Sequence, residues 1–225
     1  MRQKQGEDAR NRVLSATSLL GKGVSFLDVG CGNGKLTMEF ANRLGLSHIY
    51  GVDNDSKRLV EAKNRGVITE RVDLNKDVLP FQDNYFDIVL CHQVAEHIVN
   101  VDCLLQEIWR VLKPDGKLVI SVPNLCSLHN RLFMLFGYQP TVISPSSKFS
   151  FGNPALNGEQ LEEEVGHRHN NAFSPAAFKG ILKYYKFNVK YYWGSGIYFL
   201  PEYILKLFPG LGVVQIAIAR KAIHV

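Results

Sequence analysis

The stretch Val24-Ser-Phe-Leu-Asp-Val-Gly-Cys-Gly-Asn-Gly34 decides the fold of this chain. Its apolar half suits a strand that is covered on both faces, because buried parallel strands read as nearly continuous apolar runs. The three alternating glycines permit positive φ angles or a close approach of the backbone to a ligand. The next segment, Lys35 to Leu44, places Leu36, Phe40 and Leu44 on one helical face. The sequence therefore predicts a strand, a tight turn and a helix N-terminus, where free N–H groups favour an anion.

The spacing of the glycines argues against a dinucleotide site. The G-x-G-x-x-G fingerprint would need its third glycine at the position of Lys35. The motif present is Asp28-x-Gly30-x-Gly32-x-Gly34, which resembles the first motif of class I S-adenosylmethionine-dependent methyltransferases. The resemblance implies that these four residues hold the methionine end of the cofactor, with Cys31 beside them. The alternative is a glycine turn that only joins a strand to a helix.

A second buried strand, Ser47 to Asp53, ends on a carboxylate 23 residues after Gly30. Nucleoside-binding α/β units place an acid at about this distance, where its two oxygens accept hydrogen bonds from the ribose hydroxyls. We therefore predict that Asp53 holds the ribose, with Asn54 next to it in the cofactor site. Asp53 could also cap the following helix, and the two roles are compatible for neighbouring residues.

A third strand, predicted over residues 67–72, ends at Asp73 and Leu74. The resemblance implies that Asp73 meets the adenine amino group and Leu74 one face of the ring, whereas Asp73 could equally be a solvated loop acid. Two later runs, Arg110 to Lys117 and Val119 to Asn124, are similar to the same family. Five strand–helix steps in register identify the chain as a member of these methyltransferases.

The family resemblance implies one α/β domain over residues 1–225. Its expected architecture is a doubly wound, seven-stranded, mostly parallel sheet with an antiparallel last strand and helices on both faces. Residues 125–172 match nothing that can be carried over position by position. Much of this stretch is rich in Ser, Pro, Gly and Asn. Long irregular stretches of this kind are usually functional loops. We therefore expect a substrate lid inserted after the fifth strand.

The residues after the fourth strand should face the reacting centre, because ligands bind at the carboxyl ends of strands in open α/β sheets. We assign Cys91 and Gln93 to the cofactor side, Glu96 to the substrate, and His97 to deprotonating or positioning the methyl acceptor. The alternative for His97 is a helix-start histidine that caps or packs.

Glu96-His97 resembles part of a Glu-x-x-Glu-His run that holds a divalent metal in some O-methyltransferases, including ubiquinone-biosynthesis and small-RNA enzymes. Gln93 stands where the first Glu would be. The loss of one anionic ligand disfavours a Mg²⁺ site, since that ion prefers carboxylate and water oxygens. We predict no bound metal.

His167 and His169 precede a helix that Ser174 and Pro175 are expected to begin. We place both histidines at the substrate, which requires the lid to fold back over the site. An alternating pair of histidines on an exposed loop is otherwise simply solvated.

Composition and charge constrain partners and location weakly. The chain has 225 residues, a net charge of +5 with scattered Lys and Arg, and four cysteines without a C-x-x-C pair. Reduced thiols and a polar N-terminus favour a cytoplasmic protein. The apolar segment 193–212 is too interrupted by Pro201, Glu202, Lys206 and Pro209 to span a bilayer, which needs ~20 apolar residues. It could pack on the core, line a pocket or make peripheral contact with a membrane.

We therefore predict an enzyme that uses S-adenosylmethionine to methylate a small-molecule or lipid-like acceptor at oxygen. A nucleic-acid methyltransferase is the first rival, supported by the positive charge and by the partial Glu-His resemblance. It lacks a visible aromatic and basic stacking platform. The second rival is a non-catalytic scaffold, which would have no need of the intact cofactor residues. The sequence does not indicate the oligomeric state.

Overall fold

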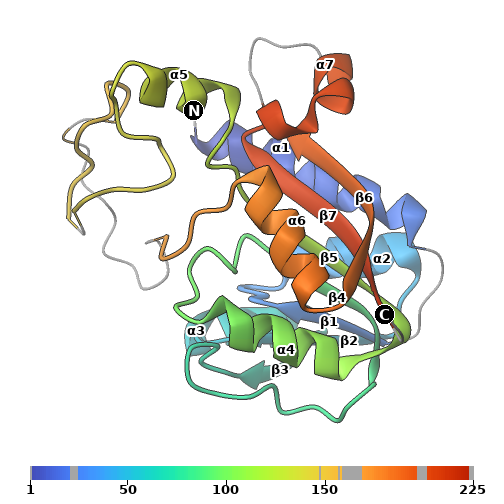
Figure 1. The fold of residues 1–225 in the computed structure, drawn as a ribbon. Helices are drawn as coiled ribbons and strands as arrows, with labels where there is room; N and C mark the ends of the chain where they lie inside the picture. Colours follow the sequence, from blue (N-terminus) through green and yellow to red (C-terminus); the bar gives the residue numbers. More distant parts are fainter. Residues whose placement is uncertain are drawn as a thin grey trace.

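A computed structural model describes residues 2–20, 25–146, 148–156, 158, 169–196 and 202–222. It shows one seven-stranded sheet in the order β3-β2-β1-β4-β5-β7-β6 with helices on both faces (Figure 1). The strands are β1 (Ser25–Val29), β2 (His48–Asp53), β3 (Ile68–Arg71), β4 (Phe86–His92), β5 (Leu112–Pro123), β6 (Phe187–Ser195) and β7 (Val214–Lys221). The α-helices are α1 (Arg2–Ser15), α2 (Lys35–Leu44), α3 (Ser56–Asn64), α4 (Val101–Val111), α5 (Leu128–Leu135), α6 (Pro175–Tyr184) and α7 (Glu202–Leu207). Two short 3-10 helices are η1 (Ala16–Leu19) and η2 (Pro209–Leu211).

The pairing of the strands confirms the predicted topology. Strands β1 to β5 pair in parallel, and β7 lies antiparallel between β5 and β6. The carboxyl ends of β1 to β5 therefore lie along one edge of the sheet. The chain order reverses between β1 and β4, and a ligand crevice is expected at such a switch point.

Two hydrophobic clusters cover the two faces of the sheet. One contains buried side chains of α1, α2 and α3, with Phe26 of β1 stacked on Phe40 of α2 at 5.1 Å between ring centroids. The other contains buried side chains of α4 and α6, including Ile108, Phe178 and Leu182. Because both faces are buried, the strands need the continuous apolar sequence from which they were predicted.

Residues 112–116 include the turn-forming residues Pro114, Asp115 and Gly116, yet they belong to β5. Phe86 pairs with Leu112, but Ile88 pairs with Lys117, so residues 113–116 form an irregularity within the strand. Asp115 takes a positive φ of 60° there. The strand stays continuous across this irregularity because the residues on either side of it pair with β4.

Beyond β5, α5 is followed by irregular chain up to α6 in the residues described there. Figure 1 shows these loops, in yellow, projecting beside α5. Leu125 and Phe173 join the two ends of the stretch, because the Leu125 N–H donates to the Phe173 carbonyl at 3.0 Å. Its role as a substrate lid stays a prediction.

Two predictions concern the environment of the chain. All four cysteines are free, as predicted, although the cytoplasmic location itself stays a prediction. No helix among the described residues is both long and apolar enough to cross a membrane.

Candidate functional site

The glycine turn adopts the conformation that its sequence predicts. Gly30, Gly32 and Gly34 have φ angles of 78°, 52° and 76°, which L side chains rarely adopt. A Cβ on Gly30 would lie 2.4 Å from Val94, whereas no atom lies within 4 Å of the position that a Cβ would take on Gly32. The turn is therefore packed against Val94 at Gly30 and open at Gly32. This open backbone fits the close approach of a ligand.

Asp28 lies beneath the turn. Its side chain is buried and accepts a hydrogen bond from Thr37 of α2 at 2.6 Å. Burial raises the pKa of Asp28 to about 7, because it disfavours the charged carboxylate. A positively charged ammonium group nearby would favour the charged form. The observed contact ties β1 to α2 and supports the turn. The predicted role at the methionine end stays a prediction.

Asp53, at the carboxyl end of β2, is joined to the same turn. Its carboxylate accepts from the Gly32 N–H at 2.9 Å and from the Asp55 N–H at 3.0 Å. Each oxygen has a further lone pair, so both can still accept a ribose hydroxyl. Asp55, rather than Asp53, caps α3 by accepting from Lys57 and Arg58. The neighbouring Asn54 is exposed and contacts Arg71 through its carbonyl oxygen at 3.2 Å.

Asp73 is held in a turn after β3. It accepts from the Asn75 N–H, and Lys76 lies 3.1 Å from it, and these contacts hold its pKa below the ordinary value. Leu74 is half-buried and packs against the core. The structure thus gives Asp73 a local structural role, and its predicted contact with adenine stays a prediction.

The end of β4 places two predicted cofactor residues differently. The Cys91 side chain is fully buried in the core, where burial raises the pKa of its thiol, so any ligand contact would have to use its backbone. Gln93 has a positive φ of 55° and is half-buried, and its side chain donates to Ser121 at 3.3 Å. The unusual backbone at Gln93 turns the chain at the end of the strand.

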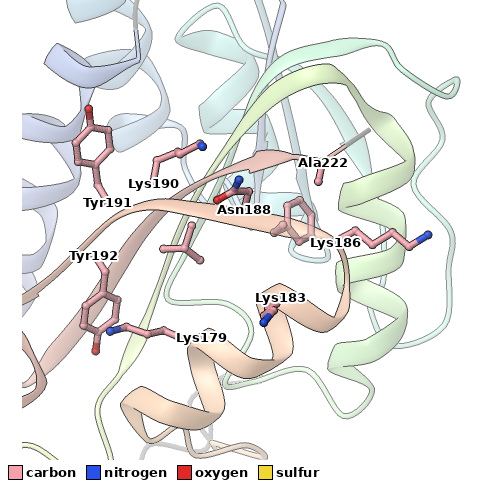
Figure 2. A pocket seen from close by; sticks show the side chains of 10 residues that line it. Lys179, Lys183, Lys186, Asn188, Lys190, Tyr191, Tyr192 and Ala222 are labelled. Atoms are coloured by element: carbon pink, nitrogen blue, oxygen red, sulfur yellow. The ribbon is translucent and has the colours of Figure 1, made fainter. Parts of the chain in front are cut away.

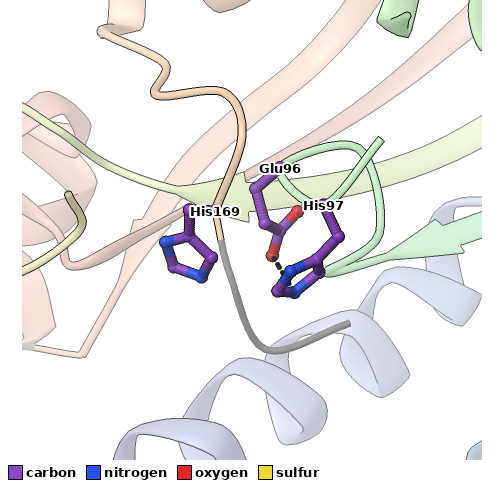
Figure 3. A group of neighbouring side chains, drawn as sticks. All are labelled: Glu96, His97 and His169. Carbon is purple, nitrogen blue, oxygen red and sulfur yellow. Dashed lines mark ion pairs between the residues drawn. The ribbon is translucent and has the colours of Figure 1, made fainter. Parts of the chain in front are cut away.

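Glu96, His97 and His169 come together at this edge of the sheet (Figure 3). Glu96 is 1% exposed, its Oε2 has no hydrogen-bond partner within the described residues, and burial raises its pKa to about 8. The Glu96 Oε1 atom lies 3.9 Å from His97 Nε2, which is beyond hydrogen-bond distance. The two imidazole rings meet edge to face at 5.0 Å.

Backbone hydrogen bonds bring His169 to this cluster. The N–H groups of Asn170 and Asn171 donate to the Glu96 carbonyl at 2.6 and 3.0 Å, and the Asn170 side chain donates to the His97 carbonyl. The Nδ1 atom of His169 also lies 2.8 Å from the carbonyl oxygen of Val142. The predicted return of the chain to the site therefore holds at His169. His167 lies outside the described residues.

The cluster offers ligand atoms for a cation. One atom each from Glu96, His97 and His169 lies within 4.8 Å of the others. Carboxylate and imidazole together suit a transition metal better than Mg²⁺. The prediction that no metal is bound stays a prediction.

Several residues that shape the site were not predicted from the sequence. Asn170 and Asn171 anchor the returning segment, Thr37 holds Asp28, and Val94 packs against Gly30. His92 was also not predicted as a site residue, although it lies five residues before His97 in the sequence. Burial lowers the pKa of His92 to about 4, and its Nδ1 lies 2.6 Å from the Ser121 hydroxyl. Only the proximity of histidines after β4 could have indicated it.

A surface groove of about 590 Å³ lies elsewhere, between α6 and β6 (Figure 2). Its lining includes Lys179, Lys183, Lys186 and Lys190, and the Lys179 ammonium lies 3.9 Å from the centre of the Tyr192 ring. None of the predicted site residues lines it. Its size is that of a ligand pocket, but the chemistry described above is at the carboxyl edge of the sheet.

Known proteins with sequences similar to this chain are methyltransferases. Residues 27–120 match the family model of the methyltransferase domain. The mitochondrial ubiquinone biosynthesis O-methyltransferase of Bos taurus is 29% identical over 181 residues, covering 77% of this chain and 47% of that protein. The ubiquinone/menaquinone biosynthesis C-methyltransferase of Paraburkholderia phymatum is 34% identical over 103 residues, covering 44% of this chain and 42% of that protein. The chain thus spans about half the length of these curated relatives.

A solved structure shares the whole fold. An S-adenosylmethionine-dependent methyltransferase from Mesorhizobium loti aligns with a TM-score of 0.65 at 19% identity, covering 94% of this chain and 97% of that one. The open Gly32 backbone and the Asp53 carboxylate fit the cofactor that such domains use. Residues 27–120 thus match the methyltransferase domain, within a fold shared with an S-adenosylmethionine-dependent enzyme, and S-adenosylmethionine is the cofactor that such a domain implies.

Proposed function

We propose that the protein transfers a methyl group from S-adenosylmethionine to an oxygen atom of a small, lipid-like acceptor. The observation that carries this proposal is the placement of His97 beside buried Glu96 and His169, at the carboxyl edge that also bears the glycine turn. Relatives named for ubiquinone and menaquinone biosynthesis support a quinone-like acceptor with an apolar tail.

Methyl transfer from a sulfonium is an in-line displacement in which positive charge disperses. Orienting the two reactants can lower the activation barrier by roughly 7 to 11 kcal/mol. The cofactor supplies the activated methyl group, and the protein has to hold the acceptor in line and remove its proton. A general base adds about 10²- to 10⁴-fold for a hydroxyl acceptor.

His97 is suited to accept that proton. Burial raises the pKa of Glu96 to about 8, so its carboxyl is mostly neutral at pH 7. When His97 takes the acceptor's proton, the new imidazolium lies 3.9 Å from Glu96 Oε1, and release of the Glu96 proton to solvent would offset its charge. His169, across from His97, contacts the insertion through Val142 and can position the acceptor.

Cofactor binding is tested by calorimetric titration with S-adenosylhomocysteine, with NAD as the comparison ligand. We expect the chain to bind S-adenosylhomocysteine but not NAD. Asp53→Ala should abolish this binding, because the Asp53 carboxylate would hold the ribose. Glu61→Ala removes an exposed acid of α3 and serves as the matched control. No binding by the unaltered chain would favour the scaffold rival.

The base is tested once an accepted phenol or quinol is found by screening. His97→Ala should lower turnover by about 10²- to 10⁴-fold with little change in cofactor affinity. His48→Ala, which removes an exposed histidine at the start of β2, should leave turnover unchanged. Unchanged turnover in His97→Ala would remove His97 from the mechanism, and a methyl group found on carbon would contradict the choice of oxygen.

The nucleic-acid rival has one observation in its favour, the lysine-lined groove between α6 and β6 (Figure 2). Binding to phosphates would weaken steeply with salt, because neutralised phosphates release counterions. Titration of a fluorescent RNA at two salt concentrations, with Lys183→Gln and Lys190→Gln, would detect it. We expect weak binding that these substitutions do not change.

A further inference from the structure

Exposed apolar side chains gather on one part of the molecule, which we call the α5 face. Of the 18 large hydrophobic residues that are exposed among those described, eight lie between residues 132 and 151. They are Leu132, Met134, Leu135, Phe136, Tyr138, Ile143, Phe149 and Phe151. Leu135 and Phe136 are 74% and 72% exposed. Soluble monomers rarely leave so many large apolar side chains together in water.

Helix α5 has the reverse of the usual arrangement of a surface helix. Its buried residue is the polar Asn130, whose amide donates to the Asn124 carbonyl and accepts from the Thr141 N–H. The aliphatic residues Leu132 and Leu135 face outward instead. A surface helix normally buries its apolar stripe. Here the stripe is held toward solvent by hydrogen bonds on the opposite side.

The loops after α5 extend the same face because they are hydrogen-bonded to one another. The Tyr138 N–H donates to the Phe133 carbonyl, and the Gln139 N–H donates to the Gly152 carbonyl at 2.8 Å. The Asn153 amide donates back to the Gln139 carbonyl at 2.6 Å. The end of α5 and the loop bearing Phe149 and Phe151 are therefore one connected surface.

The charge of this part of the chain indicates its partner. Residues 116–158 contain no Asp or Glu, whereas Arg131 and Lys148 are exposed within the α5 face. The next carboxylates in the sequence, from Glu159 to Glu164, lie outside the described residues. Aliphatic and aromatic side chains with interspersed cations and no anions complement a surface that is apolar inside and negative at its rim.

We propose that the α5 face docks onto an anionic phospholipid bilayer. The apolar side chains would enter the boundary between headgroups and acyl chains, and Arg131 and Lys148 would contact lipid phosphates. The face is tied to the site, since Asn130 binds the carboxyl end of β5 at Asn124 and Val142 contacts His169. Docking would therefore hold the acceptor side of the site against the membrane, a consequence that rests on the proposed function.

Co-flotation of the purified full chain with lipid vesicles tests docking in the absence of cofactor and acceptor, so the result is independent of methyl transfer. Vesicles of phosphatidylcholine with phosphatidylglycerol are compared with vesicles of phosphatidylcholine alone. We expect flotation with the anionic vesicles, and a fall of at least about tenfold in the bound fraction for Leu135→Ser/Phe136→Ser. The double variant Arg131→Gln/Lys148→Gln should lose the preference for anionic lipid.

A matched control uses the other exposed apolar pair, Leu207 and Phe208, which are 71% and 61% exposed in the segment 193–212. Leu207→Ser/Phe208→Ser should float as the unaltered chain does. Three outcomes would each overturn the proposal. They are equal flotation of Leu135→Ser/Phe136→Ser and the unaltered chain, loss of flotation only in Leu207→Ser/Phe208→Ser, and no flotation of the unaltered chain. A dimer that becomes monomeric in the α5 variant, without flotation, would assign the face to a second copy and also overturn it.

Discussion

Replacing Glu96 by glutamine tests the electrostatics of the site through stability. Burial raises the pKa of Glu96 from its ordinary value of 4.5 to about 8. Between these values the folded state binds more protons than the unfolded state at this group, so the free energy of unfolding falls as the pH rises. The slope is about 1.4 kcal/mol per pH unit. From pH 6 to pH 8, the wild type should lose about 2 kcal/mol through Glu96 alone.

Glutamine has nearly the same shape and no charge, so Glu96→Gln should remove this loss. Two other buried groups also titrate: the pKa of Asp28 is raised to about 7, and that of His92 is lowered to about 4. Both are present in the wild type and the variant, and their contributions cancel in the difference. The stability of the variant relative to the wild type should therefore rise by about 2 kcal/mol from pH 6 to pH 8.

Urea unfolding at pH 6, 7 and 8 measures this difference. Glu70→Gln, at an exposed position of β3, is the control and should keep the slope of the wild type. Parallel pH curves for Glu96→Gln and the wild type would refute the reasoning, because they would mean that Glu96 has an ordinary pKa in the fold. They would also remove the argument that a neutral carboxyl lies next to His97.

Two further predictions concern the glycine turn and the cluster of Glu96, His97 and His169. Gly30→Ala should lower the free energy of unfolding by at least about 2 kcal/mol, because the new Cβ would lie 2.4 Å from Val94 at a φ of 78°. Gly45→Ala, at a φ of 65° with no atom within 4 Å, should cost only about 1 kcal/mol, and equal losses in urea unfolding would contradict the steric argument. Dialysis against a chelator, followed by metal analysis and activity assays, should leave methyl transfer unchanged, as the prediction of no bound metal requires. An activity lost to the chelator and restored by a divalent ion would contradict that prediction and make Glu96, His97 and His169 its ligands.

The turn and the strand ends were predictable because their signals are local. The alternating residues Gly30, Gly32 and Gly34 favour positive φ angles, and Asp53 is the last residue of an apolar strand. Parallel strands bring such ends to one edge whatever the details of packing. The fold class and the antiparallel last strand therefore agree with expectation.

The local sequence did not predict which polar side chains are buried or which hydrogen-bond partners they have. Nothing local distinguishes Asp28, whose carboxyl lies under the turn bound to Thr37, from Asp53, whose carboxyl faces the turn. Cys91 likewise lies near the end of its strand, β4, yet its side chain is buried in the core. The side on which a strand-end residue points depends on the helices packed against each face.

The amino-acid sequence by itself determined the order of elements, the glycine turn and the edge of the sheet that carries the site, because these follow from apolar periodicity and backbone sterics. Only the tertiary structure decided which groups meet there. His169 reaches Glu96 and His97 through hydrogen bonds of Asn170 and Asn171 to the loop after β4, and the apolar side of α5 turns outward because Asn130 is bound inside. Such contacts join residues far apart in the chain, so no local pattern encodes them.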